Sequence, residues 1–317
     1  MDTTDLQQRL HTALTDFLWD QWVALGMAGH ASGRPVPFVI DPEALLLATL
    51  RFAMNEARFR GEVLDWMKCN GGLLSVQRAK NLHRNMPVAP LDQVRGIAGF
   101  MESHGHGNWK SLATSDVPSA ITNFTDHTLR GMSQIPDPRK PESFMLRMRQ
   151  LFGVNARVEI LTWLITHREG HAAYIARDTA WFPKSVQAIL NDLEMAAIVH
   201  SHIDGKRKTY ALSNLDSIWH AEFGKGLHWF NQAIFYHGII HVLHALEAAN
   251  DSSLSTAARA IGIRNALAPL RSAFHMTHLV PLFANTRNQN GEALVEAFHA
   301  GCSNLIDLLI QRMMMLR

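Results

Sequence analysis

The fold is decided by residues 151–213, which read LFGVNARVEILTWLITHREGHAAYIARDTAWFPKSVQAILNDLEMAAIVHSHIDGKRKTYALS. The stretch opens with three short helical patterns, of which the middle one is rich in alanine. Two strand-like runs follow, Ile198 to Ile203 and Lys208 to Leu212, and Asp204-Gly205 supplies a hairpin turn between them. The sequence therefore predicts helix, helix, helix and hairpin in that order.

The third helix of this stretch, from Lys184 to Met195, has two distinct faces. One face is apolar and is expected to be buried: Val186, Ile189, Leu190 and Leu193. The other carries short polar and cationic side chains, the type that a helix lying in the DNA major groove needs. Cations at the hairpin tip suit a phosphate backbone. The predicted DNA contacts are Lys184, Ser185, Gln187 and Asn191 on the helix, with Lys206, Arg207 and Lys208 at the tip.

This stretch resembles a winged helix-turn-helix domain of the ArsR/MarR kind. The resemblance rests on LFGVNARVEILTWL, SVQAILNDLEMAAIV and DGKRKTYAL, and it covers about a fifth of the chain. It implies double-stranded DNA as the partner and a sequence-specific transcriptional regulator as the function. One departure is Trp181-Phe182, which occupies a turn where the family usually has a small residue. Winged helices also serve as protein-interaction modules, for instance in antitoxins or scaffold subunits, and that is the alternative function.

Composition and charge restrict how this chain can contact DNA. The 317 residues are 47% hydrophobic and 18% charged, which is typical of a well-packed globular protein of two or three domains. The net charge is only +2. Seven basic and six acidic residues in 151–213 leave +1, so DNA binding must depend on where the cations lie.

The rest of the sequence is mostly helical in pattern, and a mostly α fold is expected. We expect a helical domain over 1–103, a turn-rich linker over 104–141, the winged helix over 142–213 and a helical C-terminal domain over 214–317. Asp41-Pro42-Glu43 is typical of a helix start, with a capping side chain, a first-turn proline and an early acid. Two helices meeting at Gly262 are expected near Ser253 to His278.

A second basic helix is expected from Leu73 to His83. Its exposed side is predicted to carry Ser75, Gln77, Arg78, Lys80 and Arg84. A Gly-Gly turn before it gives a helix-turn-helix-like pattern. A solvated basic face on a helical bundle is the favoured interpretation.

The sequence contains no recognisable catalytic motif. It has no Gly-rich phosphate loop after a strand, no GxSxG and no CxxC, so we expect neither an enzyme nor a cofactor. His237, His241 and His244 share one helix face and, with His275 or His278, have the spacing for a zinc site; helix-face hydrogen bonding is favoured instead. The pair His104 and His106 lacks companion ligands, so no metal is expected.

Location and assembly follow from the apolar pattern. The first residues lack a signal-peptide pattern and no apolar run reaches spanning length, so a cytoplasmic protein without membrane contact is expected.

Cys69 and Cys302 are expected to be buried and unpaired. A homodimer is predicted through the helices after Ser213, using the aromatic run from Trp219 to Tyr236 and the apolar stripe from Leu294 to Met313. The alternative is that these stripes close the monomer's own core.

Overall fold

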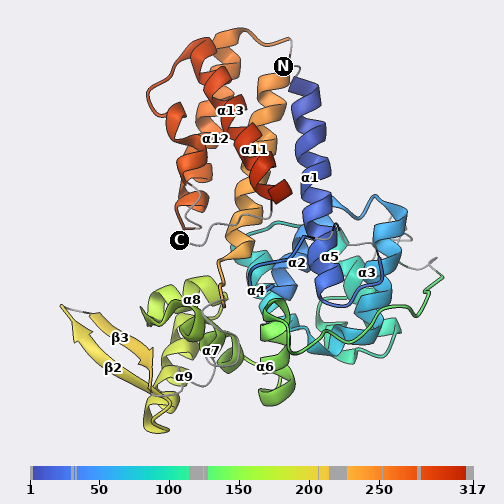
Figure 1. The fold of residues 1–317 in the computed structure, drawn as a ribbon, viewed down its shortest axis with the longest axis vertical. Helices are drawn as coiled ribbons and strands as arrows, with labels where there is room; N and C mark the ends of the chain where they lie inside the picture. The colour runs from blue at the N-terminus through green and yellow to red at the C-terminus, as the bar shows by residue number, and fades with distance from the viewer. Residues whose placement is uncertain are drawn as a thin grey trace.

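The computed structural model describes residues 3–29, 32, 34–113, 124, 128–205, 207–213, 227–251, 253–276 and 280–311. These residues are mostly helical, as the sequence predicted. Figure 1 shows three groups of elements: a tall bundle that contains the N-terminus, a cluster of helices beside its base, and a smaller helical group that carries the β-hairpin. The three groups meet at the centre of the molecule.

The N-terminal helices enclose α2, the most buried element among them. The helices are α1 (Thr3–Ala24), α2 (Pro42–Phe52), α3 (Ala57–Asn70), α4 (Val76–Asn85) and α5 (Leu91–Ser103), with short 3-10 turns at Gly71–Leu73 and Gly107–Ser111. The predicted start of α2 is confirmed: the Asp41 carboxylate accepts the backbone N–H of Ala44 at 3.1 Å, and Pro42 opens the first turn. Of the residues of α2, all but Arg51 are buried.

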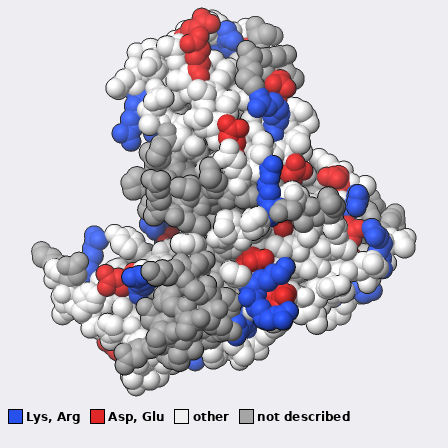
Figure 2. Space-filling model, viewed as in Figure 1, with Lys and Arg blue, Asp and Glu red and all other residues white. Residues whose placement is uncertain are grey.

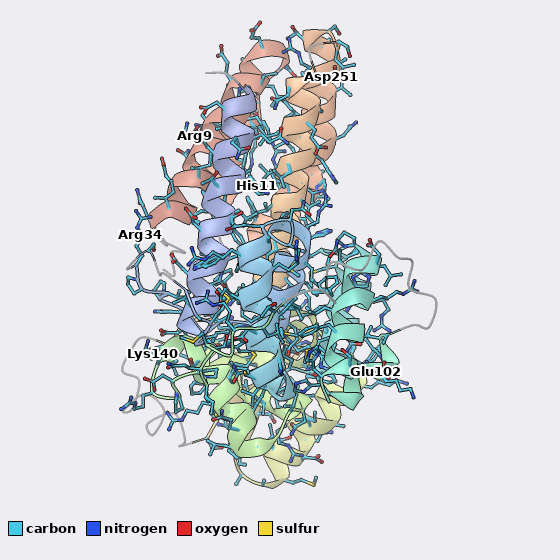
Figure 3. All side chains as sticks on the ribbon, turned by 90° about the vertical axis from the view of Figure 1, so that its right-hand side faces the viewer. Arg9, His11, Arg34, Glu102, Lys140 and Asp251 are labelled. Atoms are coloured by element: carbon cyan, nitrogen blue, oxygen red, sulfur yellow. The ribbon has the colours of Figure 1, made fainter. Side chains whose placement is uncertain are left out.

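The C-terminal helices stand beside α1 in the tall bundle (Figures 1 and 3). They are α11 (Gln232–Asn250), α12 (Thr256–Met276) and α13 (Gly291–Gln311), with a 3-10 segment at Val280–Thr286. Figure 3 shows Arg9 and His11 on α1 within this bundle and Asp251 at its far end. The two helices predicted to meet at Gly262 form one helix, α12. A Cβ at Gly262 would lie 2.7 Å from the Ala248 side chain, so this glycine permits close packing of α12 on α11 and does not make a turn.

The segments 1–103 and 214–317, expected to be separate domains, share one apolar core. Phe17 of α1 lies edge-on to Phe235 of α11, with ring centroids 6.2 Å apart, and both belong to the same buried cluster as Phe298 of α13. Cys302 is buried in it, as expected, whereas Cys69 is exposed because it lies on the outer side of α3.

Most of the apolar side chains predicted to form a dimer contact are buried in the core of a single chain. The described members that are buried within the chain are Trp229, Phe230, Phe235, Tyr236, Leu294, Phe298, Leu305, Ile306 and Leu309. Trp219, Phe223 and Met313 lie outside the described residues. The described residues include one helix, α13, that is long and apolar enough to cross a membrane by length and composition, with a mean hydropathy of 1.3. Its apolar side packs against α1.

The second half of the predicted linker is bound to the N-terminal helices. The Asp65 carboxylate of α3 accepts three consecutive backbone N–H groups, from Gly131, Met132 and Ser133, at 2.7, 3.0 and 2.9 Å. Arg130 pairs with Glu62 of the same helix. Residues 128–134 are therefore fixed along the surface and do not act as a free tether.

The third group contains the segment that the sequence analysis singled out. It comprises a 3-10 turn (Pro141–Ser143), α6 (Phe144–Phe152), α7 (Ala156–His167), β1 (Glu169–His171), α8 (Ala172–Thr179), α9 (Pro183–Met195), β2 (Val199–Asp204) and β3 (Arg207–Leu212). The strands form an antiparallel sheet in the order β1-β3-β2. The predicted hairpin is present, and its pairing closes at Asp204 and Arg207.

Strand β1 was not predicted, because Glu-Gly-His has no β-propensity pattern. Its position depends on Gly170, which pairs with Tyr210. A Cβ at Gly170 would lie 2.2 Å from the Trp163 ring. Only glycine lets the strand pass this close to the indole, so β1 is set by a tertiary contact.

Candidate nucleic-acid interface

Helix α9 presents to solvent most of the side chains predicted to contact DNA. Its apolar face, Val186, Leu190 and Leu193, is buried in the core of the third group, and Ile189 is half-buried. Lys184, Ser185, Ala188 and Asn191 are exposed. The outward polar face was therefore predicted correctly, with Gln187 at its edge.

Gln187 is half-buried and already engaged. Its Nε2 donates to the Tyr210 hydroxyl at 2.5 Å and to Asn191 Oδ1 at 3.0 Å. Tyr210 lies in β3 and is buried, so this contact fixes the helix against the sheet. Gln187 would have to give up a hydrogen bond to contact a base, whereas Lys184 and Ser185 make no side-chain hydrogen bond with the other described residues.

The cations of the hairpin differ in how much of their charge is compensated. Lys208 Nζ lies 2.7 Å from Glu194 Oε2, and the hydrogen bonds from Lys208 and Ser201 lower the pKa of Glu194. Arg207 donates to the Tyr174 hydroxyl at 2.9 Å and has no acidic partner among the described residues. Lys206 lies outside the described residues. Arg207 is thus the uncompensated cation of the described hairpin.

Two residues of α8 join this surface and were missed by the sequence analysis. Tyr174 is 45% exposed, and the guanidinium carbon of Arg207 lies 5.9 Å from its ring centroid. Arg177 lies 5.3 Å from the same centroid while pairing with Asp178 at 2.7 Å. An aromatic ring flanked by two arginines suits contact with a sugar-phosphate backbone. Only the tertiary arrangement reveals it, because Arg207 is 33 positions away from Tyr174 in the sequence.

The basic helix α4 lies beside the start of α9. The Arg84 guanidinium carbon is 4.8 Å from the ring centroid of Phe182, the 47%-exposed residue that precedes α9. The predicted exposed face of α4 was only partly correct. Gln77 and Arg84 are exposed and Lys80 is half-buried, but Ser75 and Arg78 are buried. Ser75 caps α4 by accepting the N–H of Arg78 at 3.2 Å.

Arg78 is buried because it forms part of a charged cluster between the N-terminal helices and the third group. It makes a bidentate pair with Asp41 at 2.5 Å, a 2.8 Å pair with Glu43, and a 3.0 Å hydrogen bond to the Thr179 carbonyl at the end of α8. These polar contacts compensate for the loss of hydration on burial.

Arg149 of α6 completes the cluster. Its guanidinium group donates to both carboxylate oxygens of Glu43, at 2.6 and 2.8 Å, and to Glu159 of α7 at 2.6 Å. The Leu73 carbonyl accepts a further hydrogen bond at 2.8 Å. Trp181 Nε1 donates to Glu159 at 3.2 Å, and this contact accounts for the bulky residue in the turn before α9.

The charged cluster fixes the candidate interface relative to the N-terminal helices. Arg78, Arg149, Asp41, Glu43 and Glu159 are each at most 2% exposed. They come from or adjoin α2, α4, α6 and α7, so α9 and α4 are held in one orientation. The end of α4 meets the start of α9 at the contact between Arg84 and Phe182.

Comparisons with known proteins do not extend this description. No family model, curated protein or solved structure matches the chain. The assignment of a function therefore rests on the geometry alone.

The surface charge agrees with the weak net charge of the sequence. On the face shown in Figure 2, the described Lys and Arg residues occur in small groups beside Asp and Glu. They do not form one basic field there. A DNA contact would thus be restricted to a few cations.

Two of the histidines considered as metal ligands lie close together in the described part of the chain. The rings of His237 and His241 are 4.8 Å apart, and burial lowers the pKa of both. No group of three or more His, Cys, Asp or Glu residues suited to a metal ion occurs among the described residues. The side chain of His275 and the whole of His278 lie outside them.

The other histidine pair is engaged with backbone groups. His104 Nδ1 is 2.8 Å from the Phe100 carbonyl, and His106 Nε2 is 3.0 Å from the Lys68 carbonyl. The two rings therefore contact backbone carbonyls of two different helices, α5 and α3. The geometry supports a role in packing for this pair.

Proposed function

We propose that residues 144–213 form a winged helix domain and that the protein is a sequence-specific DNA-binding transcriptional regulator. The observation that carries the proposal is the order α7-β1-α8-α9-β2-β3 with an antiparallel sheet of order β1-β3-β2. In this arrangement α9 is anchored by an apolar face and presents a polar one, as a recognition helix requires.

In the proposed complex, α9 lies in the major groove and the hairpin contacts the backbone. Lys184, Ser185 and Asn191 would contact base edges, since Lys pairs with guanine acceptors and Asn with adenine. Arg207 and Lys206 would neutralise phosphates. Gln187 and Lys208 would contribute only by exchanging their present partners, Tyr210 and Glu194.

Asn191→Ala tests base recognition. DNA fragments selected from a random pool at a fixed salt concentration first define the preferred site. The substitution is expected to cost about 1–3 kcal/mol on that site while leaving the affinity for random DNA unchanged. Asn304→Ala, at an exposed position of α13, is the matched control and should bind as the parent protein does. Equal losses on selected and random DNA would contradict a base contact.

Arg207→Ala tests the phosphate contact. Removing one phosphate contact should weaken binding to every sequence alike and reduce the slope of log K against log salt by about 0.9. Titrations at several salt concentrations measure this slope. Arg139→Ala removes a cation that is 86% exposed and lies outside the interface, so its slope should be unchanged. An unaltered slope for Arg207→Ala would exclude a phosphate contact.

We also propose that the regulator acts as a homodimer. One winged helix with a charge of about +1 binds DNA weakly, and two half-sites roughly 34–36 Å apart are the usual remedy. Because most described residues of the C-terminal stripes are buried within the chain, the contact would mainly use other surfaces. Light scattering should give a dimeric mass; a monomeric mass at concentrations that bind DNA would contradict this part.

The alternative function, a protein-interaction module, has one observation in its favour. Met195 at the end of α9 is 80% exposed, and Ile203 in the hairpin is 79% exposed. Large apolar side chains at such exposure are suited to a protein partner. A selection that enriches no DNA fragment would favour this alternative.

A further inference from the structure

An apolar groove opens in the third group, on the side of α7 that faces the end of α9. It has a volume of about 340 Å³. Its walls come from four elements, with Met148 and Phe152 from α6, Leu161 and Ile165 from α7, Leu193 from α9 and Leu212 from β3. The groove therefore lies where the proposed recognition helix and the base of the hairpin meet α6 and α7.

The size and lining of the groove fit a small molecule. Sites for small ligands typically have about 300–1,000 Å³, mostly apolar walls and a few placed polar groups. Phe152 at the rim is 50% exposed, and a ligand in the groove would cover its ring.

Two charged side chains line the groove, and they pair with each other. Arg157 Nη2 lies 3.3 Å from Asp192 Oδ2, and the two side chains are 48% and 54% exposed. This single long contact leaves most of the five N–H donors of the guanidinium group for a second acceptor. Arg157 also lies in the first turn of α7, where the helix dipole favours an anion.

We propose that this groove binds a small carboxylic acid with an apolar aliphatic or aromatic body. The carboxylate pairs with Arg157, and the body lies between Leu161, Leu193 and Phe152. The acid would also be a regulatory ligand, a role that rests on the proposed DNA-binding function. It would act on α9 directly. Leu193 belongs to the last turn of α9, so occupancy fixes that turn against α7 and alters DNA affinity.

Binding is tested first without DNA, on the full chain. Decanoate, decanol and decylamine share one apolar body and differ in charge, so calorimetric titration separates the anionic group from the apolar one. We expect saturable binding of decanoate, at least tenfold weaker binding of decanol, and the weakest binding of decylamine. Tightest binding of decylamine, or no saturable binding of decanoate, would overturn the proposal.

Two variants locate the site. Arg157→Gln should weaken decanoate at least tenfold and leave decanol unchanged, whereas Arg139→Gln, outside the groove, should change neither. Ala196→Trp, at an exposed position on the groove wall, should fill the groove and abolish binding of both. Undiminished decanoate binding by both groove variants would show binding elsewhere and overturn the proposal.

A final titration separates this proposal from the proposed function. Decanoate should change the affinity of the parent protein for its selected DNA site and leave that of Ala196→Trp unchanged. If no DNA site is found, the proposed function is wrong, but the titrations without DNA still show whether the groove binds the acid. If DNA binds but decanoate has no effect on it, the regulatory role is overturned.

Discussion

Replacing Arg149 with methionine is expected to lower the free energy of unfolding by about 3–5 kcal/mol. The substitution keeps an unbranched side chain that replaces the stem of arginine, but it removes the guanidinium group and leaves Glu43 and Glu159 buried without their shared cation. Both carboxylates are at most 1% exposed, so water cannot replace the lost guanidinium group. A buried charge without a partner costs far more than a surface pair contributes.

Urea unfolding at neutral pH measures this loss, with Arg139→Met as the control. Arg139 pairs with Asp137 at 3.1 Å, but its side chain is 86% exposed. Exposed pairs contribute about 1 kcal/mol at most, so the same change of residue type should cost little there. Similar losses for the two variants would show that the charged cluster does not hold the third group against the N-terminal helices.

The charged cluster of Arg78 and Arg149 also shows where sequence-based prediction stops. Local signals were sufficient for the start of α2: the Asp41 cap lies three residues before the N–H group that it accepts. Arg78, in contrast, was placed on a solvated face because arginine is usually exposed. Its partner Asp41 is 37 residues away, and Glu43 and Arg149 are separated by 106. Periodicity contains no information about such pairs.

The same limit applies to α12 and to the candidate interface. Gly262 was expected to make a turn, but its role is set by Ala248 on the neighbouring helix. The outward direction of Lys184 and Asn191 follows from helical spacing and was predicted. The partners of Gln187 and Lys208 were not, because Tyr210 and Glu194 approach them only when the sheet packs on α9.

A further large loss of stability is expected in acid, again because of the charged cluster. Burial alone raises the pKa of Glu43, but Arg149, Arg78 and the Ser75 N–H together lower it from its ordinary value of 4.5 to about 2. The folded pKa lies below the unfolded one, so the stability from Glu43 is fully present above pH 4.5. It is lost as the pH falls from 4.5 to about 2.

Within that window the unfolded chain binds one more proton at this position than the folded chain. The free energy of unfolding should therefore fall by about 1.4 kcal/mol per pH unit through Glu43 alone. The pKa of Asp65 is also lowered, because three backbone N–H groups outweigh the effect of its burial, and this adds a loss of the same sign.

Urea unfolding at several pH values between 5 and 2 tests the contribution of Glu43. Glu43→Gln lowers stability at every pH, but its curve should be flatter by about 1.4 kcal/mol per pH unit, because the titrating group is gone. Asp137→Asn removes a surface carboxylate that is 33% exposed and whose pKa Arg139 lowers, and solvent screening should keep its curve close to parallel with that of the parent. A Glu43→Gln curve parallel to the parent curve would mean that the pKa of Glu43 is the same in the folded and unfolded chains, which its contacts with two arginines make unfavourable.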